Sequence, residues 1–141
     1  MGLTLLDTSV VVGLLDRDDA LHVAAADAIE RELDARQTLA LSAVSWAEVL
    51  SGADRVSGAG FDGDRFLERG GIPVLPVDRA VAETAAGIRR RAARGRRRVR
   101  TPDALVLGTA DAHPDVDRVL TTDEQWRGLR LDGARIVVVR P

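Results

Sequence analysis

The stretch Leu3-Thr4-Leu5-Leu6-Asp7-Thr8-Ser9-Val10-Val11-Val12 decides the fold of this 141-residue chain. Its first four residues are mostly apolar and lack strict alternation, which is typical of a strand inside a parallel sheet. Asp7 follows at the carboxyl end of that strand, where open α/β sheets bind their ligands. The stretch therefore predicts a carboxylate at a ligand site, and its alternative interpretation is that Asp7 or Thr8 caps the next helix.

The rest of the chain alternates between strand and helix patterns. We expect strands at 38–41, 72–77, 119–121 and 135–139, of which the proline-bounded 72–77 is an edge strand. We expect helices at 9–15, about 21–33, 42–53, around 66–67, 78–94 and 101–113, a helical turn at 123–129 and a glycine-rich loop at 57–63. Thr101 is the expected cap of the helix that begins with Pro102. This alternation predicts an α/β fold with a mostly parallel sheet and helices on both faces.

Composition limits the possible classes of protein. The length predicts a single domain over residues 1–141, and a hydrophobic content of 45% is sufficient for an ordinary core. The absence of cysteine excludes disulfides and thiolate metal sites. No basic segment precedes the first apolar run, so we expect neither a signal peptide nor a membrane span, and a cytoplasmic protein.

Four acidic residues follow predicted strands or lie near helix starts, namely Asp7, Glu48, Asp103 and Asp123. Each has a structural alternative. Glu48 stands three residues after Ser45, which is capping-box spacing, Asp103 suits the first turn of a helix, and Asp123 can cap the turn behind it. In a doubly wound sheet, however, Asp7, Asp103 and Asp123 are expected at the same edge, and the helix that carries Glu48 is expected to face them.

Such a cluster of acids needs a counter-charge. Two unit charges about 4 Å apart repel by roughly 4 kcal/mol at an effective dielectric constant of 20, and the chain contains no lysine. Mg²⁺ or Mn²⁺, with one or two ions bound, is the natural occupant of an all-oxygen site. Ions of this kind activate water for attack on a phosphodiester.

At these residues the sequence resembles the PIN-domain family of nucleases, and most closely its VapC-type toxins. The matching motifs, in the same order over essentially the whole chain, are Leu5-Leu6-Asp7-Thr8-Ser9, Ser45-Trp46-Ala47-Glu48, Pro102-Asp103-Ala104 and Leu120-Thr121-Thr122-Asp123. The resemblance implies a three-layer α/β/α sandwich and a metal-dependent endoribonuclease that cuts structured RNA such as tRNA or rRNA. It also implies a homodimer and a VapB-type antitoxin that inserts into the site.

The resemblance also implies roles for individual residues. Asp7, Glu48, Asp103 and Asp123 would be the catalytic metal ligands, with Thr8, Ser9 and Thr121 supporting them. Gln125 stands where members often carry a further acid, and an amide is a poorer ligand for a second ion.

The basic residues are segregated. Eight arginines without an intervening acid are Arg89, Arg90, Arg91, Arg94, Arg96, Arg97, Arg98 and Arg100, and we call them the arginine segment. The rest of the chain contains twelve arginines and 22 acidic residues, so its net charge is about −10. The segment is either a solvated helix end, an RNA-binding surface beside the acidic site, or a contact for an acidic stretch of the antitoxin. RNA is favoured, because an acidic site otherwise repels a polyanion.

Other residues and functions were weighed against this hypothesis. Trp46 is expected in the core or a subunit interface, with base stacking by Trp46 or Trp126 as the alternative. His22 and His113 are expected at the surface or at helix ends. A haloacid-dehalogenase-like phosphatase is disfavoured by the absence of lysine and by Ser9, which stands where such sites carry a second aspartate. A non-catalytic RNA-binding module would use the acids as caps only.

Overall fold

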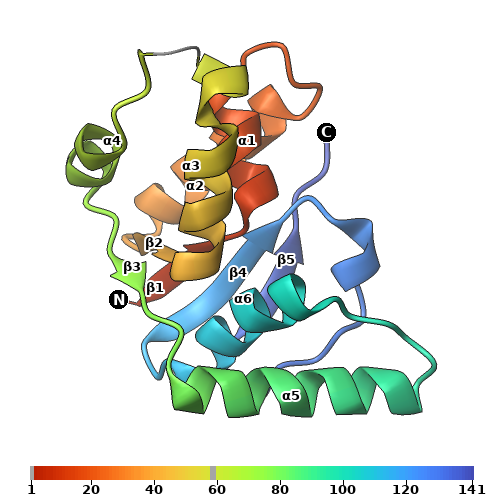
Figure 1. Ribbon diagram of the computed structural model, residues 1–141. Helices are drawn as coiled ribbons and strands as arrows, with labels where there is room; N and C mark the ends of the chain where they lie inside the picture. The colour runs from red at the N-terminus through yellow and green to blue at the C-terminus, as the bar shows by residue number, and fades with distance from the viewer. Residues whose placement is uncertain (1, 58–59) are drawn as a thin grey trace.

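A computed structural model of the chain describes residues 2–57 and 60–141 and shows a three-layer α/β/α sandwich (Figure 1). The central sheet has the strand order β3-β2-β1-β4-β5, and every pair of neighbours is parallel. Its strands are β1 (Leu3–Leu6), β2 (Thr38–Ser42), β3 (Val74–Leu75), β4 (Val116–Thr121) and β5 (Arg135–Val138). The predicted fold class is confirmed, with a sheet that is parallel throughout.

The helices cover the two faces of this sheet. One layer contains α1 (Thr8–Leu15) and α2 (His22–Asp34), with α3 (Ala43–Ser57) packed on α1 and α4 (Gly63–Gly70) beyond it. The other layer contains α6 (Thr101–Ala112), which lies against the sheet, and α5 (Arg79–Arg94), which packs on α6. The short 3₁₀ helix η2 (Glu124–Trp126) follows β4.

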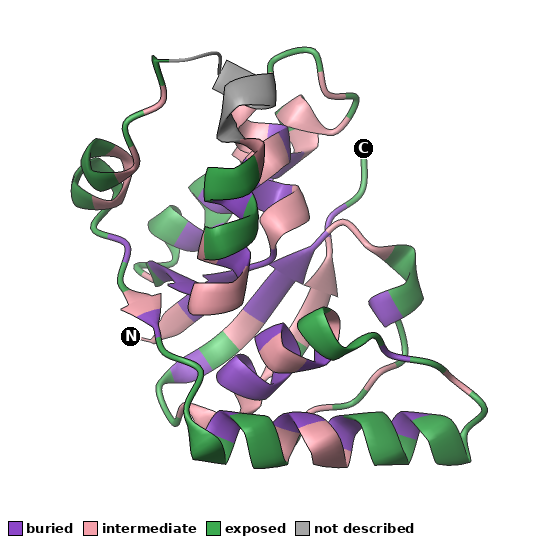
Figure 2. Cartoon of the chain, viewed as in Figure 1, coloured by how far each residue is buried: buried purple, intermediate pink, exposed green. Residues whose placement is uncertain are grey.

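Side-chain alternation along the strands divides the core between these layers. On β1, Leu5 packs with the cluster formed by α5 and α6, whereas Leu6 packs with the cluster formed by α1 and α2. Val119 and Leu120 divide in the same way on β4. All four side chains are at most 1% exposed (Figure 2). The run of consecutive apolar residues in β1 therefore reflects a strand buried on both faces, as expected.

Several expected boundaries were wrong by a few residues. β3 is reduced to two residues because Pro73 and Pro76 flank it and proline has no N–H to donate. β4 begins three residues early, at Val116, because the polar Arg118 continues the strand and its guanidinium lies 3.4 Å from the buried Glu32. Thr101 is the first residue of α6, and its N-cap is Arg100.

The loop expected at 57–63 falls partly on residues 58 and 59, which lie outside the described residues, and Gly63 already belongs to α4. Among the described helices, none combines the length and apolar character needed to cross a bilayer.

The packing of α6 on α5 depends on Gly108. A Cβ added there would lie 2.9 Å from the Val81 carbonyl oxygen and 3.0 Å from the Ala85 Cβ, closer than normal contact. We therefore expect Gly108→Ala to lower the free energy of unfolding by about 1–3 kcal/mol, although alanine normally stabilises a helix interior. Urea denaturation measures this change.

Gly87 in α5 provides the matched control, because the nearest atom to its added Cβ is the end of the Arg90 side chain at 4.0 Å. Gly87→Ala should raise stability by up to about 1 kcal/mol. Equal effects of the two substitutions would contradict close helix packing at Gly108.

Candidate active site

Asp7 is a buried carboxylate at the carboxyl end of β1. Its side chain is at the N-cap of α1, and the residue is 8% exposed. Its Oδ1 accepts a hydrogen bond from the Thr8 backbone N–H (2.8 Å), and its Oδ2 accepts from Ser9 Oγ (3.1 Å) and Thr121 Oγ1 (2.8 Å). These three donors fix the orientation of the carboxylate and leave about one of its four lone-pair sites free.

The position of Asp7 follows from the topology of the sheet. β1 lies between β2 and β4, and the chain builds the sheet first on one side of β1 and later on the other. A crevice forms at such a switch point, outside the carboxyl ends of the two strands. Here the Asp7 N–H donates to the Leu120 carbonyl (2.9 Å), and Thr121 ends β4 beside it.

Asp103 and Asp123 reach the same edge from other elements. Asp103 lies in the first turn of α6 and is half-buried, and Asp123 is the N-cap of η2, immediately beyond β4. Burial and the charge of Asp123 raise the pKa of Asp103, which the nearby guanidinium of Arg100 partly offsets. Asp103 and Asp123 are therefore close enough to repel each other.

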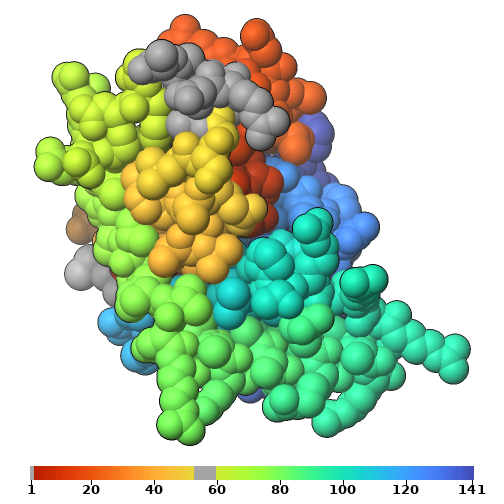
Figure 3. Space-filling view, in the orientation of Figure 1, coloured from red at the N-terminus to blue at the C-terminus, as the bar shows by residue number. Residues whose placement is uncertain are grey.

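Burial also raises the pKa of Asp7 to about 6, against the effect of its three hydrogen-bond donors. The charge of Asp103 adds to this increase, and Glu48 contributes to that of Asp103. All four predicted acids thus belong to one electrostatically coupled group. Figure 3 shows the segments that carry them meeting on one face of the molecule: the start of α1, α3, the start of α6 and the residues after β4.

The capping alternatives hold for some of these acids and fail for another. Asp7 and Asp123 are both N-caps. The Asp7 carboxylate accepts from the Thr8 N–H, and the Asp123 carboxylate accepts from the Gln125 N–H (2.9 Å). The capping box at Ser45 and Glu48 was wrong, because α3 begins at Ala43, before Ser45. Glu48 instead accepts a hydrogen bond from Thr8 Oγ1 (3.2 Å).

The predicted hydroxyl residues connect the acids to one another. Ser9 Oγ accepts from the Thr122 N–H (3.2 Å) while donating to Asp7, and Thr121 Oγ1 accepts from the Asp123 N–H (3.1 Å) while donating to Asp7. A single network therefore joins the ends of β1 and β4, so the loop bearing Asp123 is held relative to Asp7.

The donor set fits a hard divalent cation, because it consists of carboxylate and hydroxyl oxygens. Within the part of the chain that the structure describes, no three acidic or imidazole side chains are grouped closely enough to hold one ion. Mg²⁺ commonly retains several water ligands and uses only one or two carboxylates. The observed spacing is consistent with that mode of binding.

The arginine segment lies beside the acids. Arg97, Arg98 and Arg100 line a cavity of about 40 Å³ together with Asp103 and Asp123. The other members are exposed, and Arg89 Nε donates to the Val99 carbonyl (3.0 Å). Sequence reasoning missed three arginines far along the chain, Arg127, Arg130 and Arg135, because only the folded chain brings their surface next to the segment.

The aromatic and histidine residues are structural. Trp126 is 3% exposed within the core, so no ring face is available for base stacking. Trp46 stacks on Phe66 with ring centroids 6.2 Å apart. His22 begins α2 and pairs with the Gly13 carbonyl (2.8 Å), and His113 is the C-cap of α6, as expected for helix-end residues.

Comparisons with known proteins agree with this fold. A family model described as the PIN domain matches residues 4–130. Among solved structures, the chain is similar to VapBC2 from Rickettsia felis bound to a promoter DNA fragment (14% identity, 98% of this chain and 99% of that chain covered, TM-score 0.75). It is also similar to DNA-bound VapBC from Salmonella typhimurium (22%, 98% and 98%, TM-score 0.70).

A third similar structure is Mycobacterium tuberculosis VapC20, described as a sarcin-ricin loop cleaving toxin (18% identity, 98% of this chain and 99% of that chain covered, TM-score 0.65). At these identities the similarity shows the shared fold alone. No match was found among curated protein sequences.

The burial of Asp7 predicts a pH dependence of stability in metal-free protein. With the pKa of Asp7 raised to about 6, the folded protein protonates this carboxyl as pH falls through 6, whereas the unfolded chain does so only near 3.9. The free energy of unfolding should therefore rise between pH 7 and pH 4, and Asp7 should account for about 2 kcal/mol of that rise. We expect Asp7→Asn to remove this component, as measured by urea denaturation in chelator.

Asp27, an exposed aspartate on α2, is the control. Asp27→Asn should keep the wild-type dependence between pH 4 and pH 7. An unchanged dependence in Asp7→Asn would show that Asp7 does not bind this proton.

Proposed function

This chain belongs to the PIN-domain family, and from that premise we propose that it is a Mg²⁺- or Mn²⁺-dependent endoribonuclease, the toxin of a toxin–antitoxin pair. The observation that carries this proposal is the coupled group of Asp7, Glu48, Asp103 and Asp123 at the switch point of the sheet. An acid group in which burial raises the pKa of Asp7 and that of Asp103, with no lysine to neutralise it, is suited to a divalent cation.

We propose that one or two of Asp7, Asp103 and Asp123 bind one ion directly and that the other acids, with Glu48, hold it through its water ligands. When bound, the ion lowers the pKa of an attacking water and neutralises charge on the leaving oxygen. Thr121 and Ser9 hold the Asp7 carboxylate by hydrogen bonds, so its free lone pair points to a fixed place. Thr8 orients Glu48 in the same way. Gln125 adds no charge, so a second ion would have fewer acidic ligands.

RNA is the substrate that the surface charge favours. The acids alone would repel a polyanion, whereas Arg97, Arg98 and Arg100 line the cavity that also contains Asp103 and Asp123. A positive rim around a negative centre attracts phosphates and delivers one of them to the cation. The similar VapC20 toxin cleaves the sarcin-ricin loop, and by analogy we propose structured RNA, tRNA or rRNA, as the target.

We propose a small VapB-type antitoxin as the partner, since the similar VapBC structures contain a toxin and an antitoxin. A cavity of about 640 Å³ between α2, β2 and α4 has a mainly apolar lining that includes Leu33 and Phe66. Leu33 is 51% exposed there. This cavity is suited to an apolar helix face.

A homodimer is also proposed. Leu50 is 49% exposed on α3, the helix that carries Trp46. A second copy packed on α3 would cover it, and light scattering of the purified protein measures the oligomeric state.

The nuclease proposal is tested by RNA cleavage. Purified protein should cleave RNA with Mg²⁺ or Mn²⁺ and stop when a chelator is added. Asp103→Asn should lower the cleavage rate at least about 100-fold, because it removes a charge needed at the cation. Mapping the new RNA ends after incubation identifies the cut sites.

Asp27→Asn serves as the matched control because it also neutralises one aspartate, on the exposed face of α2 away from the site. It should retain the wild-type rate. Cleavage that persists in chelator and survives Asp103→Asn would refute the proposal, and RNA binding without hydrolysis would favour a non-catalytic module.

The antitoxin proposal is tested by reading the neighbouring gene for a small DNA-binding protein and co-expressing that protein with this chain. Leu33→Asp places a charge in the apolar cavity and should weaken complex formation at least about tenfold. Val23→Asp is the control, because Val23 is 69% exposed on the same helix but does not line the cavity. Equal binding by both variants would place the antitoxin elsewhere.

A further inference from the structure

Three cavities with shared lining residues lie between the acidic site and the edge strand β5. The cavity of about 40 Å³ at Asp103 and Asp123 adjoins one of about 280 Å³ beside the end of α5, which adjoins one of about 350 Å³ beside β5. Leu129 lines all three, and Arg130 lines the second and third. We call these three neighbouring cavities the arginine tract.

The charged residues that line the tract are all positive, except at the acidic site. Every charged residue that lines the second and third cavities is an arginine, and these are Arg91, Arg97, Arg127, Arg130 and Arg135. Acidic lining residues, Asp103 and Asp123, occur at one end only. The tract is therefore a positive path that leads away from the four acids.

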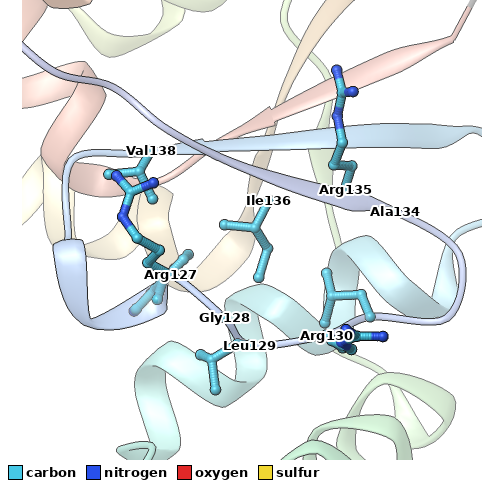
Figure 4. Close-up of a pocket in the computed structure, with 10 residues that line it drawn as sticks. Arg127, Gly128, Leu129, Arg130, Ala134, Arg135, Ile136 and Val138 are labelled. Carbon is cyan, nitrogen blue, oxygen red and sulfur yellow. The ribbon is translucent and has the colours of Figure 1, made fainter.

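The floor of the tract is apolar. Leu131 and Ile136 line the cavity beside β5, and Figure 4 shows Ile136 pointing from the strand toward the segment that carries Gly128 and Leu129. α6 lies against β4, whereas this face of β5 is covered by the segment after η2 (Figure 1). Leu129, Leu131 and Ile136 are only half-buried, so apolar surface remains partly accessible between the arginines.

Two of these arginines are available to a ligand. Arg130 is exposed and forms no ion pair with any residue that the structure describes. Arg91 is also exposed and lies 3.8 Å from Asp132, which is itself 89% exposed, so this ion pair is weak. Binding a phosphate at either position therefore breaks no strong interaction.

We propose that the arginine tract binds an unpaired RNA strand on one side of the scissile phosphate. Arginines contact its phosphates, and the apolar floor contacts its bases, which only an unstacked strand can present. The inference rests on the proposed nuclease function, because it places the scissile phosphate at the acids. The cavity at Asp103 and Asp123 shares Arg97 and Leu129 with the next cavity, which favours a strand that occupies both over a ligand that binds the tract alone.

The test compares two double variants that lose the same charge. Arg91→Gln/Arg130→Gln removes one weakly paired and one unpaired arginine of the tract. Arg79→Gln/Arg31→Gln is the control: Arg79 pairs with Glu83, and Arg31 is exposed on α2 with no ion pair among the described residues. Arg79 lies on α5, twelve residues before Arg91, which is about 18 Å along the helix.

Binding is measured in an Asp7→Asn background with chelator, so that the result does not depend on cleavage. The probe is fluorescent polyuridine of about 16 nucleotides, long enough to fill the tract. The tract variant should bind about tenfold more weakly at physiological salt. Its slope of log K against log salt should fall by about 0.7 for each lost phosphate contact. The control variant should match the Asp7→Asn parent in both.

Three results would overturn the tract as an RNA site: equal binding by the two double variants, tighter binding of duplex RNA, or polyglutamate binding as tightly as RNA through the same arginines. Cleavage assays with the active-site aspartate restored distinguish this failure from failure of the nuclease proposal. If the tract is correct, the tract variant loses rate on long RNA but not on a uridine dinucleotide. Cleavage of long RNA at the wild-type rate overturns the tract alone, and no cleavage by the wild type overturns the nuclease proposal.

Discussion

The hydrogen bond from Thr121 to Asp7, 2.8 Å long and buried, is the interaction on which the candidate site depends. It joins the carboxyl ends of β1 and β4, two neighbouring strands that are 114 residues apart at these positions. Because Thr121 also accepts from the Asp123 N–H, one hydroxyl sets the positions of two acids. The Thr121 side chain thus links the pairing of β1 with β4 to the relative positions of Asp7 and Asp123.

Burial of the Asp7 side chain disfavours its ionised form. Desolvation raises the pKa of Asp7 to about 6, and its three hydrogen-bond donors only partly compensate. A group that is costly to ionise in the free protein gains from any cation that binds it. The same acids are N-caps or first-turn residues of helices, so the local stability of α1 and η2 and the electrostatics of the site use the same side chains.

The distribution of arginine balances the acids at longer range. Positive charge follows the cavities from Asp103 and Asp123 past Leu129 to β5, while the acids stay at one end. A polyanion meets arginines along its backbone, and the acids that line these cavities lie only where a cation is proposed. The fold therefore separates substrate attraction from cation binding within one surface.

The sequence alone determined the order of strands and helices along the chain, because apolar periodicity and helix-start residues are local properties. It also predicted that Asp7, Asp103 and Asp123 lie at one edge of the sheet, from their positions after strands or at helix starts. At Glu48 the local pattern left two interpretations open, because its spacing from Ser45 also suited a capping box, whereas in the structure Glu48 accepts a hydrogen bond from Thr8 of a different helix. Only the tertiary structure decided that Arg130 extends the basic surface and that Trp126 is buried. Such facts depend on which distant segments pack together, and that is set by strand order and side-chain packing, which no local window of sequence contains.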